Sequence, residues 1–340
     1  MVDLRSDTVT KPTPEMLDAM VRAEVGDDVF AEDPTVNEFE KKMAALFGVE
    51  AGLFVPSGTM SNQLCIKVLT EPGDEVILDA TGHPFNYETG AAAHLSSVQL
   101  NPLQGKRGKL TPELIESAIR PTNYWDPRSR VVAVENSTNK GGGACYSKAE
   151  LRAIKDTSDQ YGLSLHMDGA RIWNAMVATE IEPVFFGEIS DTMSVCFSKG
   201  LGAPVGSMML ASAGAISKAR RYRKMWGGGM RQVGLLAAAA DYAVEHHWPY
   251  LKEDHRRAKS LAKAISRIPG FSVKPDSVET NIVLFDVGKG EVTEVLQKLE
   301  NDGVGMVPFG PRTIRATFHF QVDDEGLDQA IRALERTGIA

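Results

Sequence analysis

Short apolar runs alternate with amphipathic stretches over residues 35–245, and this alternation predicts a parallel β-sheet whose strands are joined by helices. Several runs are apolar at every position, as strands covered on both faces must be. The predicted fold class is therefore α/β, with a mostly parallel central sheet. We expect its strands at residues 51–55, 75–79, 97–100, 131–135, 164–167, 192–197 and 206–210.

Helical patterns fill the intervals between these runs. The segment 147–161 is the clearest, because Ser147 and Glu150 form an S-x-x-E capping box at its start and Gly162 follows its end. Residues 235–246 form a further helical pattern.

The order of elements changes after residue 249, and we therefore predict a smaller α+β domain at the C-terminal end. We expect an N-terminal arm at residues 1–30, a large domain at 31–248 and the small domain at 249–340. The elements expected in the small domain are strands at 271–274, 281–286 and 313–319 and helices at 251–266, 291–301 and 325–336.

Composition excludes several classes of partner. The chain has 340 residues and a formal net charge of −8, so no overall attraction to nucleic acid or anionic lipid is expected. Apolar stretches are far shorter than the roughly 20 residues that span a bilayer. Charges at Asp3, Arg5 and Asp7 interrupt the region where a secretory signal would be apolar, so we expect a cytoplasmic protein. Three cysteines without CxxC spacing predict neither disulfides nor a metal site.

Two side chains at the ends of predicted strands suggest chemistry. Lys199 follows the run 192–197 beside glycines, where a lysine can form a Schiff base with an aldehyde such as pyridoxal phosphate. Asp168 follows the run 164–167, and a carboxylate there can keep a pyridine nitrogen protonated. Alone, the lysine is typical of a solvated surface and the aspartate of a helix cap. Because both stand at carboxyl ends of parallel strands, we expect them to meet in one ligand site.

Two further segments could bind phosphate. Ser57, Gly58 and Thr59 follow a strand and open a helix, which favours either an anion cradle or a plain N-cap. Lys224 and Arg231 flank a glycine-rich turn in a basic stretch, which could reach a phosphate in the same chain or across a subunit interface, or be a solvated basic face.

These segments together resemble the low-specificity L-threonine aldolases, which have the aspartate-aminotransferase type of pyridoxal phosphate fold. The resemblance runs from Asp3 to the last helix. The matching motifs are DLRSDTVT at 3–10, VGDD at 25–28, EDPTV at 32–36, PSGTMSN at 56–62, HMDGAR at 166–171, FSKGLGAPVG at 197–206 and GGGMRQ at 227–232.

The resemblance implies a role for each matching residue. Lys199 would be the Schiff-base lysine, Asp168 the partner of the pyridine nitrogen, and His83 the ring-stacking histidine near the substrate β-hydroxyl. The resemblance also assigns cofactor binding to Ser57, Gly58, Thr59, Lys224 and Arg231, with Arg231 from a neighbouring subunit. It assigns binding of the substrate carboxylate to Ser6, Arg171 and Arg315, and it places Arg171 at the cofactor as well.

The chain departs from the family pattern on the aldehyde side of the site. Trp125 and Thr138 stand where better-known members carry histidines, and Phe30 stands where a tyrosine is usual. An indole cannot accept a proton, so the general base would be His83, an ordered water or the cofactor phosphate.

Three hypotheses about function follow. The leading one is pyridoxal phosphate-dependent cleavage of L-threonine, L-allo-threonine and related β-hydroxy-α-amino acids to glycine and an aldehyde. The second, prompted by the missing histidines, is an amino-acid racemase or β-eliminating lyase on the same fold. The third is a non-catalytic homologue that acts by interaction alone. If Arg231 completes a neighbour's site, the protein is at least a homodimer, and the family pattern implies a tetramer.

Overall fold

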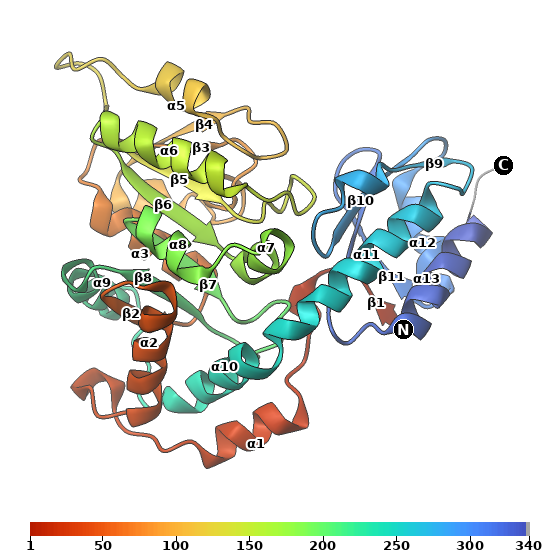
Figure 1. The fold of residues 1–340 in the computed structure, drawn as a ribbon, viewed down its shortest axis with the longest axis horizontal. Helices are drawn as coiled ribbons and strands as arrows, with labels where there is room; N and C mark the ends of the chain where they lie inside the picture. The colour runs from red at the N-terminus through yellow and green to blue at the C-terminus, as the bar shows by residue number, and fades with distance from the viewer. Residues whose placement is uncertain (338–340) are drawn as a thin grey trace.

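A seven-stranded β-sheet forms the centre of the larger part of the molecule (Figure 1). The structure is a computed structural model that describes residues 1–337. Strands β4, β3, β5, β6 and β7 run parallel, whereas β8 lies antiparallel to both of its neighbours. In spatial order the strands are β2 (Ala51–Val55), β8 (Ser207–Ala211), β7 (Thr192–Cys196), β6 (Ser164–Gly169), β5 (Arg128–Glu135), β3 (Asp74–Asp79) and β4 (Gln99–Leu103).

Helices cover both faces of this sheet, because its strands are apolar on both sides. Successive residues of a strand point to opposite faces: Leu53 and Val55 pack with one helical layer, and Phe54 packs with the other. The first layer contains α3 (Gly58–Leu69) and α9 (Ala213–Met225). The second contains α2 (Pro34–Phe47), α5 (Pro112–Ala118), α6 (Lys148–Gln160), α7 (Ile172–Thr179), α8 (Pro183–Ile189) and α10 (Gly234–His246).

The structure confirms the predicted α/β class and all of the expected strands of the large sheet, with one clear shift. The strand expected at 97–100 is β4, which begins at Gln99. It begins later because Ser97 has a φ of 55° and ends the π-helical turn Ala92–Ser96. Pro102 is tolerated inside β4 because this strand lies at the sheet edge.

The helix predicted from the capping box is also present. The Ser147 hydroxyl accepts the N–H of Glu150, and the Glu150 carboxylate accepts the N–H of Ser147. This reciprocal pair satisfies N–H groups that the first turn of α6 would otherwise leave without partners.

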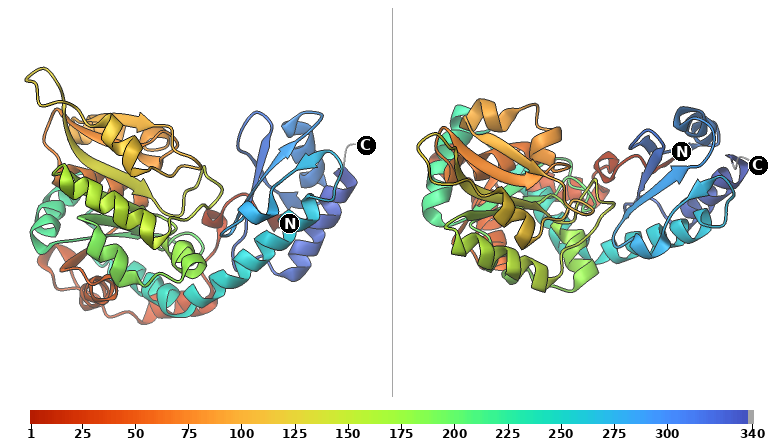
Figure 2. Two further views of the ribbon diagram at one scale, coloured as in Figure 1. Left: turned by 45° about the horizontal axis from the view of Figure 1, so that its top comes forward. Right: turned by 90° about the horizontal axis from the view of Figure 1, so that it is seen from above.

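A second core lies in the smaller part, around an antiparallel four-stranded sheet. Its strands are β12 (Val307–Pro308), β13 (Thr313–Thr317), β10 (Ile282–Val287) and β9 (Phe271–Ser272). The apolar faces of α11 (Leu251–Ile265), α12 (Val292–Asn301) and α13 (Asp324–Thr337) pack into this core. Figure 2 shows the smaller part beside the larger one, with α11 running between them.

The N-terminal segment connects the two parts. Strand β1 (Val2–Asp3) pairs with β11 (Val304–Gly305) in the smaller part, and α1 (Pro14–Arg22) packs against α10 in the larger part. The pairing of β1 with β11 was not predicted from the sequence, because a strand of two residues is too short to show a periodic pattern. The domain limits given above stay a prediction. No helix among the described residues is both long and apolar enough to cross a lipid bilayer.

The remaining short elements complete the connections. They are α4 (His83–Asn86) and the 3₁₀ turns Asp7–Val9, Asp28–Phe30, Trp248–Tyr250 and Pro275–Ser277.

Candidate active site

The carboxyl ends of the large sheet bring the predicted chemistry to one edge. Lys199 follows β7, Asp168 lies near the end of β6, and His83 begins α4 after β3. Ser57 follows β2, which runs in the same direction as β7 because both are antiparallel to β8. The predicted placement of Lys199 and Asp168 at one edge of the sheet is confirmed, and this is the edge at which open α/β sheets bind ligands.

The turn at Lys199 is held in place while its side chain stays available. The Lys199 carbonyl accepts the Thr10 hydroxyl at 3.1 Å and the Gly202 N–H at 2.8 Å. No carboxylate of residues 1–337 forms an ion pair with the Lys199 ammonium. The Nζ atom lies 4.0 Å from the place that a Cβ on Gly58 would occupy. The lysine therefore reaches the turn that opens α3.

That turn has the properties of an anion cradle. Ser57 caps α3, because its Oγ accepts the N–H of Met60 at 3.1 Å. Gly58 is required by packing, since a Cβ there would lie 2.7 Å from the sulfur of Cys196. The first N–H groups of a helix have no intrahelical acceptor, and the positive end of the helix dipole favours an anion there.

Asp168 is buried and fixed by α3. Its Oδ2 accepts the Asn62 side-chain amide at 2.8 Å, and its Oδ1 accepts the N–H of Ala170 at 3.0 Å. The Asn62 amide also donates to Glu88 at 2.9 Å, and its oxygen lies 3.2 Å from Nε2 of His166. The helix that opens with the Ser57 turn thus also orients the carboxylate.

His83 is linked to the same network through Glu88. Nδ1 of His83 lies 2.8 Å from Oε1 of Glu88, and the Glu88 carboxylate also accepts the Gln63 amide at 2.6 Å. Burial opposes the imidazolium, but the hydrogen bond to Glu88 and the charges of Asp168, Glu88 and Glu135 outweigh it and raise the pKa of His83. A proton on Nδ1, assigned from this hydrogen bond, leaves Nε2 as an acceptor.

Arg171 is paired with a buried aspartate from the N-terminal segment. Its Nε and Nη2 donate to the two carboxylate oxygens of Asp7, each at 2.7 Å, and Asn281 also donates to Asp7 at 3.2 Å. Burial opposes ionisation of Asp7, but the charge of Arg171 outweighs it and lowers the pKa of Asp7 to about 2. The carboxylate that this guanidinium binds is therefore internal, and a role for Arg171 in binding substrate or cofactor stays a prediction.

Arg315 presents a different environment. It lies on β13, and its Nη1 donates to the Asn139 side chain at 2.8 Å while Nη2 donates to the Arg5 carbonyl at 3.0 Å. Its Nε is buried and has no partner in the described chain. Burial and the nearby charge of Arg171 lower the pKa of Arg315 to about 10. A guanidinium with neutral partners and one free N–H is suited to bind a carboxylate.

Ser6 lies in the chain between Arg5 and Asp7. Its Oγ accepts the Thr8 hydroxyl at 2.8 Å and the Thr8 N–H at 3.3 Å, and the side chain is half-buried. The structure thus brings Ser6 close to the groups that surround both arginines.

Comparison with known proteins agrees with this geometry. A family model described as beta-eliminating lyase matches residues 3–287. The chain is 39% identical to the probable low-specificity L-threonine aldolase 2 of Arabidopsis thaliana, over 98% of this chain and 96% of that one. It is 36% identical to the low specificity L-threonine aldolase of Escherichia coli K12, over 96% of each chain.

The chain belongs to the low-specificity L-threonine aldolase family. A solved structure of the Leishmania major threonine aldolase has the same fold, with a TM-score of 0.85 at 21% identity, over 99% of each chain. The chain is thus an enzyme of the carbon–carbon lyase class, and the predicted resemblance is confirmed.

Family membership implies pyridoxal phosphate as the cofactor, and the site fits it. The first N–H groups of α3 have no intrahelical acceptor, and only glycine fits at position 58, because a Cβ there would lie 2.7 Å from the sulfur of Cys196. Lys199 reaches that turn, and Asp168 offers a fixed carboxylate to a pyridine nitrogen. Ser57, Gly58 and Thr59 would hold the phosphate.

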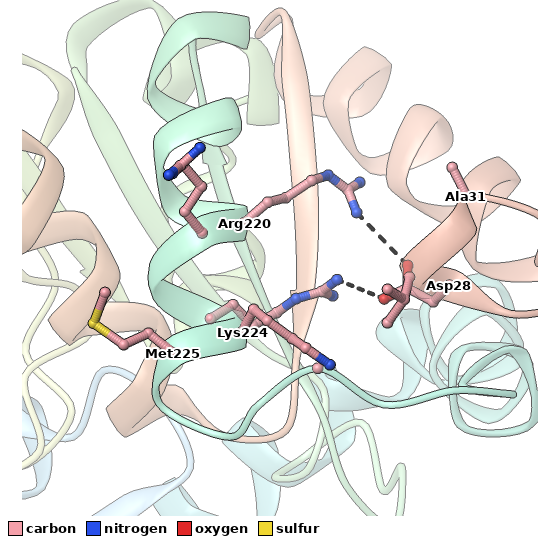
Figure 3. Close-up of a pocket in the computed structure, with 9 residues that line it drawn as sticks. Asp28, Ala31, Arg220, Lys224 and Met225 are labelled. Carbon is pink, nitrogen blue, oxygen red and sulfur yellow. Dashed lines mark hydrogen bonds and ion pairs between the residues drawn. The ribbon is translucent and has the colours of Figure 1, made fainter.

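Lys224 and Arg231 flank the glycine turn 227–229, which packs against the first turn of α3, since a Cβ on Gly228 would clash with the sulfur of Met60. Lys224 lies on the last turn of α9 and lines a cavity of about 490 Å³. Asp28 and Arg220 line the same cavity, and the Arg220 side chain points toward Asp28 (Figure 3). Arg231 pairs with Asp27 at 2.8 Å. No hydrogen bond or ion pair within residues 1–337 joins Lys224 or Arg231 to Lys199 or Asp168.

The residues that differ from the family pattern lie in different environments within one chain. Trp125 and Phe30 are 68% and 69% exposed. Thr138 is buried, and its hydroxyl donates to the Arg107 carbonyl at 2.9 Å. The described residues also contain no cluster of three or more histidine, cysteine or acidic side chains arranged to hold a metal ion.

Sequence reasoning assigned no role to four residues that organise the site. They are Asp7, Asn62, Glu88 and Glu135. Asp7 and Asn62 stand inside the matching motifs, but Asp7 bonds Arg171 at a separation of 164 positions and Asn62 bonds Asp168 at a separation of 106. The only available signal was a carboxylate or amide in a motif that otherwise supplied chemistry.

Proposed function

We propose that this protein cleaves L-threonine, L-allo-threonine and related β-hydroxy-α-amino acids to glycine and an aldehyde. The observation that carries the proposal is the arrangement at one sheet edge: Lys199 beside the Ser57 turn, and Asp168 linked through Asn62 and Glu88 to His83. The names of the relatives support the same reaction.

The chain's own residues suit the binding of an α-amino acid. Bound pyridoxal phosphate supplies an electron sink for the electron pair that remains when the Cα–Cβ bond breaks. Arg315, with its free Nε, would bind the substrate carboxylate, and Ser6 lies next to this position. Asp7 holds Arg171 and anchors the N-terminal segment beside it.

His83 is suited to take the proton of the β-hydroxyl. Glu88 fixes the ring by accepting a hydrogen bond from Nδ1–H, so that Nε2 can accept a proton. When the β-hydroxyl proton leaves, its O–H electron pair forms the aldehyde C=O bond, and the Cα–Cβ bond breaks with its electron pair passing to the electron sink. A proton added at Cα then gives glycine. Trp125 cannot act as a base, and the hydroxyl of Thr138 is bonded to a carbonyl, so His83 carries this step in our proposal.

The experiment is a measurement of glycine and aldehyde release from L-threonine and L-allo-threonine by the cofactor-loaded protein. Lys199→Ala is the control. We expect release by the wild type and none above background from the variant. If the loaded wild type releases neither product, the aldolase proposal is wrong for these substrates. Exchange of the α-proton of alanine and serine in D₂O would then test the second hypothesis, a racemase or β-eliminating lyase.

We also propose that two copies of the chain share each active site. Lys224 lines a cavity together with the apolar side chains of Met225 and Val29, which are 73% and 41% exposed, and Arg231 pairs with Asp27. A second copy covering this face would bury those side chains and bring the cations to its own phosphate site. A tetramer built from two such dimers follows the family pattern. The three cysteines are buried and unpaired, which suits a reducing cytoplasm.

Subunit complementation tests the shared site. Lys199→Ala and Arg231→Ala proteins should each be impaired, and a mixture refolded together should recover about one quarter of wild-type activity, because half of the dimers are mixed and one of their two sites is intact. A mixture no more active than the separate variants would contradict the shared site. Light scattering gives the number of subunits independently.

A further inference from the structure

Glu135 is a titratable side chain at the site edge to which the proposed reaction assigns no role. It is the last residue of β5 and pairs in register with Asp168 on the neighbouring parallel strand β6. Residues in register on adjacent strands point to the same face, so the two carboxyl groups share one side of the sheet edge. Glu135 is half-buried, and none of the described lysine, arginine or histidine side chains forms an ion pair with it.

The two carboxyl groups accept different numbers of hydrogen bonds. Asp168 accepts the Asn62 amide and the Ala170 N–H, whereas Glu135 accepts only the Asn139 N–H, at 2.8 Å. Two neighbouring carboxyl groups do not both ionise readily, and the group with fewer donors keeps the proton more easily. The geometry therefore favours Glu135 as the protonated member.

The charges around Glu135 act in the same sense. Burial and the negative charge of Asp168 raise the pKa of Glu135 to about 7, against the opposing effects of the Asn139 N–H and the positive charges of His83 and Arg171. His83 in turn faces three acidic groups, Asp168, Glu88 and Glu135. A proton on Glu135 thus removes one of the negative charges that favour the imidazolium.

We propose that Glu135 is a positioning residue that holds a proton beside Asp168 and thereby sets the charge state of His83. With Glu135 protonated, His83 is more easily neutral and can accept the β-hydroxyl proton. With Glu135 ionised, the imidazolium is favoured and this acceptance is hindered. The Glu135 proton itself is not transferred, so the proton balance of the cleavage is unchanged.

This inference rests on the proposed function only for the task of His83, and its first test does not need activity. The test is an NMR pH titration of the His83 ring, assigned with His83→Asn, in the apo and cofactor-loaded protein. Glu135→Gln keeps an oxygen for the Asn139 N–H but removes the charge. We expect it to lower the pKa of His83 by several tenths to about one unit.

Matched variants decide what such a shift means. Glu116→Gln removes one carboxylate from the exposed side of α5 and should leave the pKa of His83 unchanged. Glu135→Asp keeps the charge and should restore most of the wild-type value. An unchanged His83 pKa in a folded Glu135→Gln protein would overturn the proposal, as would an equal shift in Glu116→Gln.

Thermal unfolding gives a second readout of the same proton. A carboxyl group whose pKa is raised on folding stabilises the protein below its unfolded value and loses this contribution as the pH rises through the folded value. The window here runs from about pH 4.5 to 7. The wild type should lose stability relative to Glu135→Gln between pH 5 and pH 8. Parallel melting curves across this range would contradict a protonated Glu135.

Measurements of activity distinguish an effect of the Glu135 charge from a general effect of the substitution on the structure. The acid limb of kcat/KM for threonine cleavage should move to lower pH in Glu135→Gln, by the shift found for His83, while KM at high pH stays unchanged. A uniform loss at every pH with no shift of the limb would overturn the proposal. If the wild type cleaves no threonine, the proposed function fails while the titration still reports on Glu135.

Discussion

The two parts of the molecule each contribute one arginine to the site, and they treat its charge differently. Arg171 in the larger part is buried against the carboxylate of Asp7, with both oxygens bonded at 2.7 Å. Arg315 in the smaller part bonds only a side-chain amide and a carbonyl, and its Nε has no partner among the described residues.

This difference suits the two arginines to different roles: Arg171 stabilises the fold, whereas Arg315 can bind a ligand carboxylate. A buried guanidinium that already holds a carboxylate contributes to the fold, because loss of the partner would leave an uncompensated charge. A guanidinium with neutral partners can gain a carboxylate without giving one up. The pKa directions agree. Burial lowers the pKa of both guanidinium groups, but for Arg171 the charge of Asp7 and its hydrogen bonds outweigh burial and raise the pKa. For Arg315, burial and the nearby charge of Arg171 lower the pKa to about 10.

The largest expected effect comes from breaking the Arg171 pair. Asp7→Asn leaves the Arg171 charge buried and should cost about 3–5 kcal/mol of unfolding free energy. Asp3→Asn is the matched control, because Asp3 pairs with the exposed Arg5 in the same segment and should cost less than about 1 kcal/mol. Urea unfolding measures both, and equal losses would contradict the distinction.

The same pair predicts an acid-labile contribution to stability. The pKa of Asp7 is about 2 in the folded chain, below its ordinary value of 3.8. Its stabilisation is therefore complete above about pH 4 and is lost as the pH falls toward 2. The stability difference between wild type and Asp7→Asn should shrink over this window, and a constant difference would show that the charge of Asp7 is not its source.

A smaller effect, on binding rather than folding, is expected for Arg315. Arg315→Gln should raise the KM for L-threonine about tenfold to a hundredfold, since a hydrogen bond to a charged group contributes about 1.5–3 kcal/mol. Arg312→Gln, just before β13 and bonded to the Val287 carbonyl, is the control and should leave KM unchanged. A fall in kcat alone would assign Arg315 another task.

The smallest effect concerns the ring that supports Arg315. Phe309 lies 4.6 Å from the Arg315 guanidinium and 3.9 Å from the Lys140 ammonium. Phe309→Leu should raise KM about two- to fivefold, because an exposed cation–π contact contributes about 0.5–1 kcal/mol. Steady-state kinetics at one pH suffice, and a KM identical to the wild type would show that the ring does not orient Arg315.

Much of the site was predictable because it stands at strand ends. The apolar runs before Asp168 and Lys199 locate both residues, since parallel strands end at a common edge. The start of α3 was predictable in the same way. The difference between the partners of Arg171 and Arg315 was not predictable, because Asp7 is separated from Arg171 by 164 positions and no local sequence pattern links the two residues.

The turn between Lys224 and Arg231 is a second case. Lys224 and Arg231 stand out in the sequence as a basic stretch beside glycines, but only the fold pairs Arg231 with Asp27 and places Lys224 at the cavity that Asp28 also lines. Trp125 likewise occupies a family histidine position and yet lies exposed in a single chain.

By itself, then, the sequence determined the α/β class, the positions of the strands along the chain and the placement of Lys199, Asp168 and the Ser57 turn at strand ends, because these depend on local periodicity and on motifs of adjacent residues. Only the tertiary structure decided which arginine is paired with a carboxylate, that Asn62 and Glu88 link Asp168 to His83, and that Glu135 stands in register with Asp168. The physical reason is that charge and hydrogen-bond partners act over a few ångströms in space, and folding sets those distances among residues far apart in the chain.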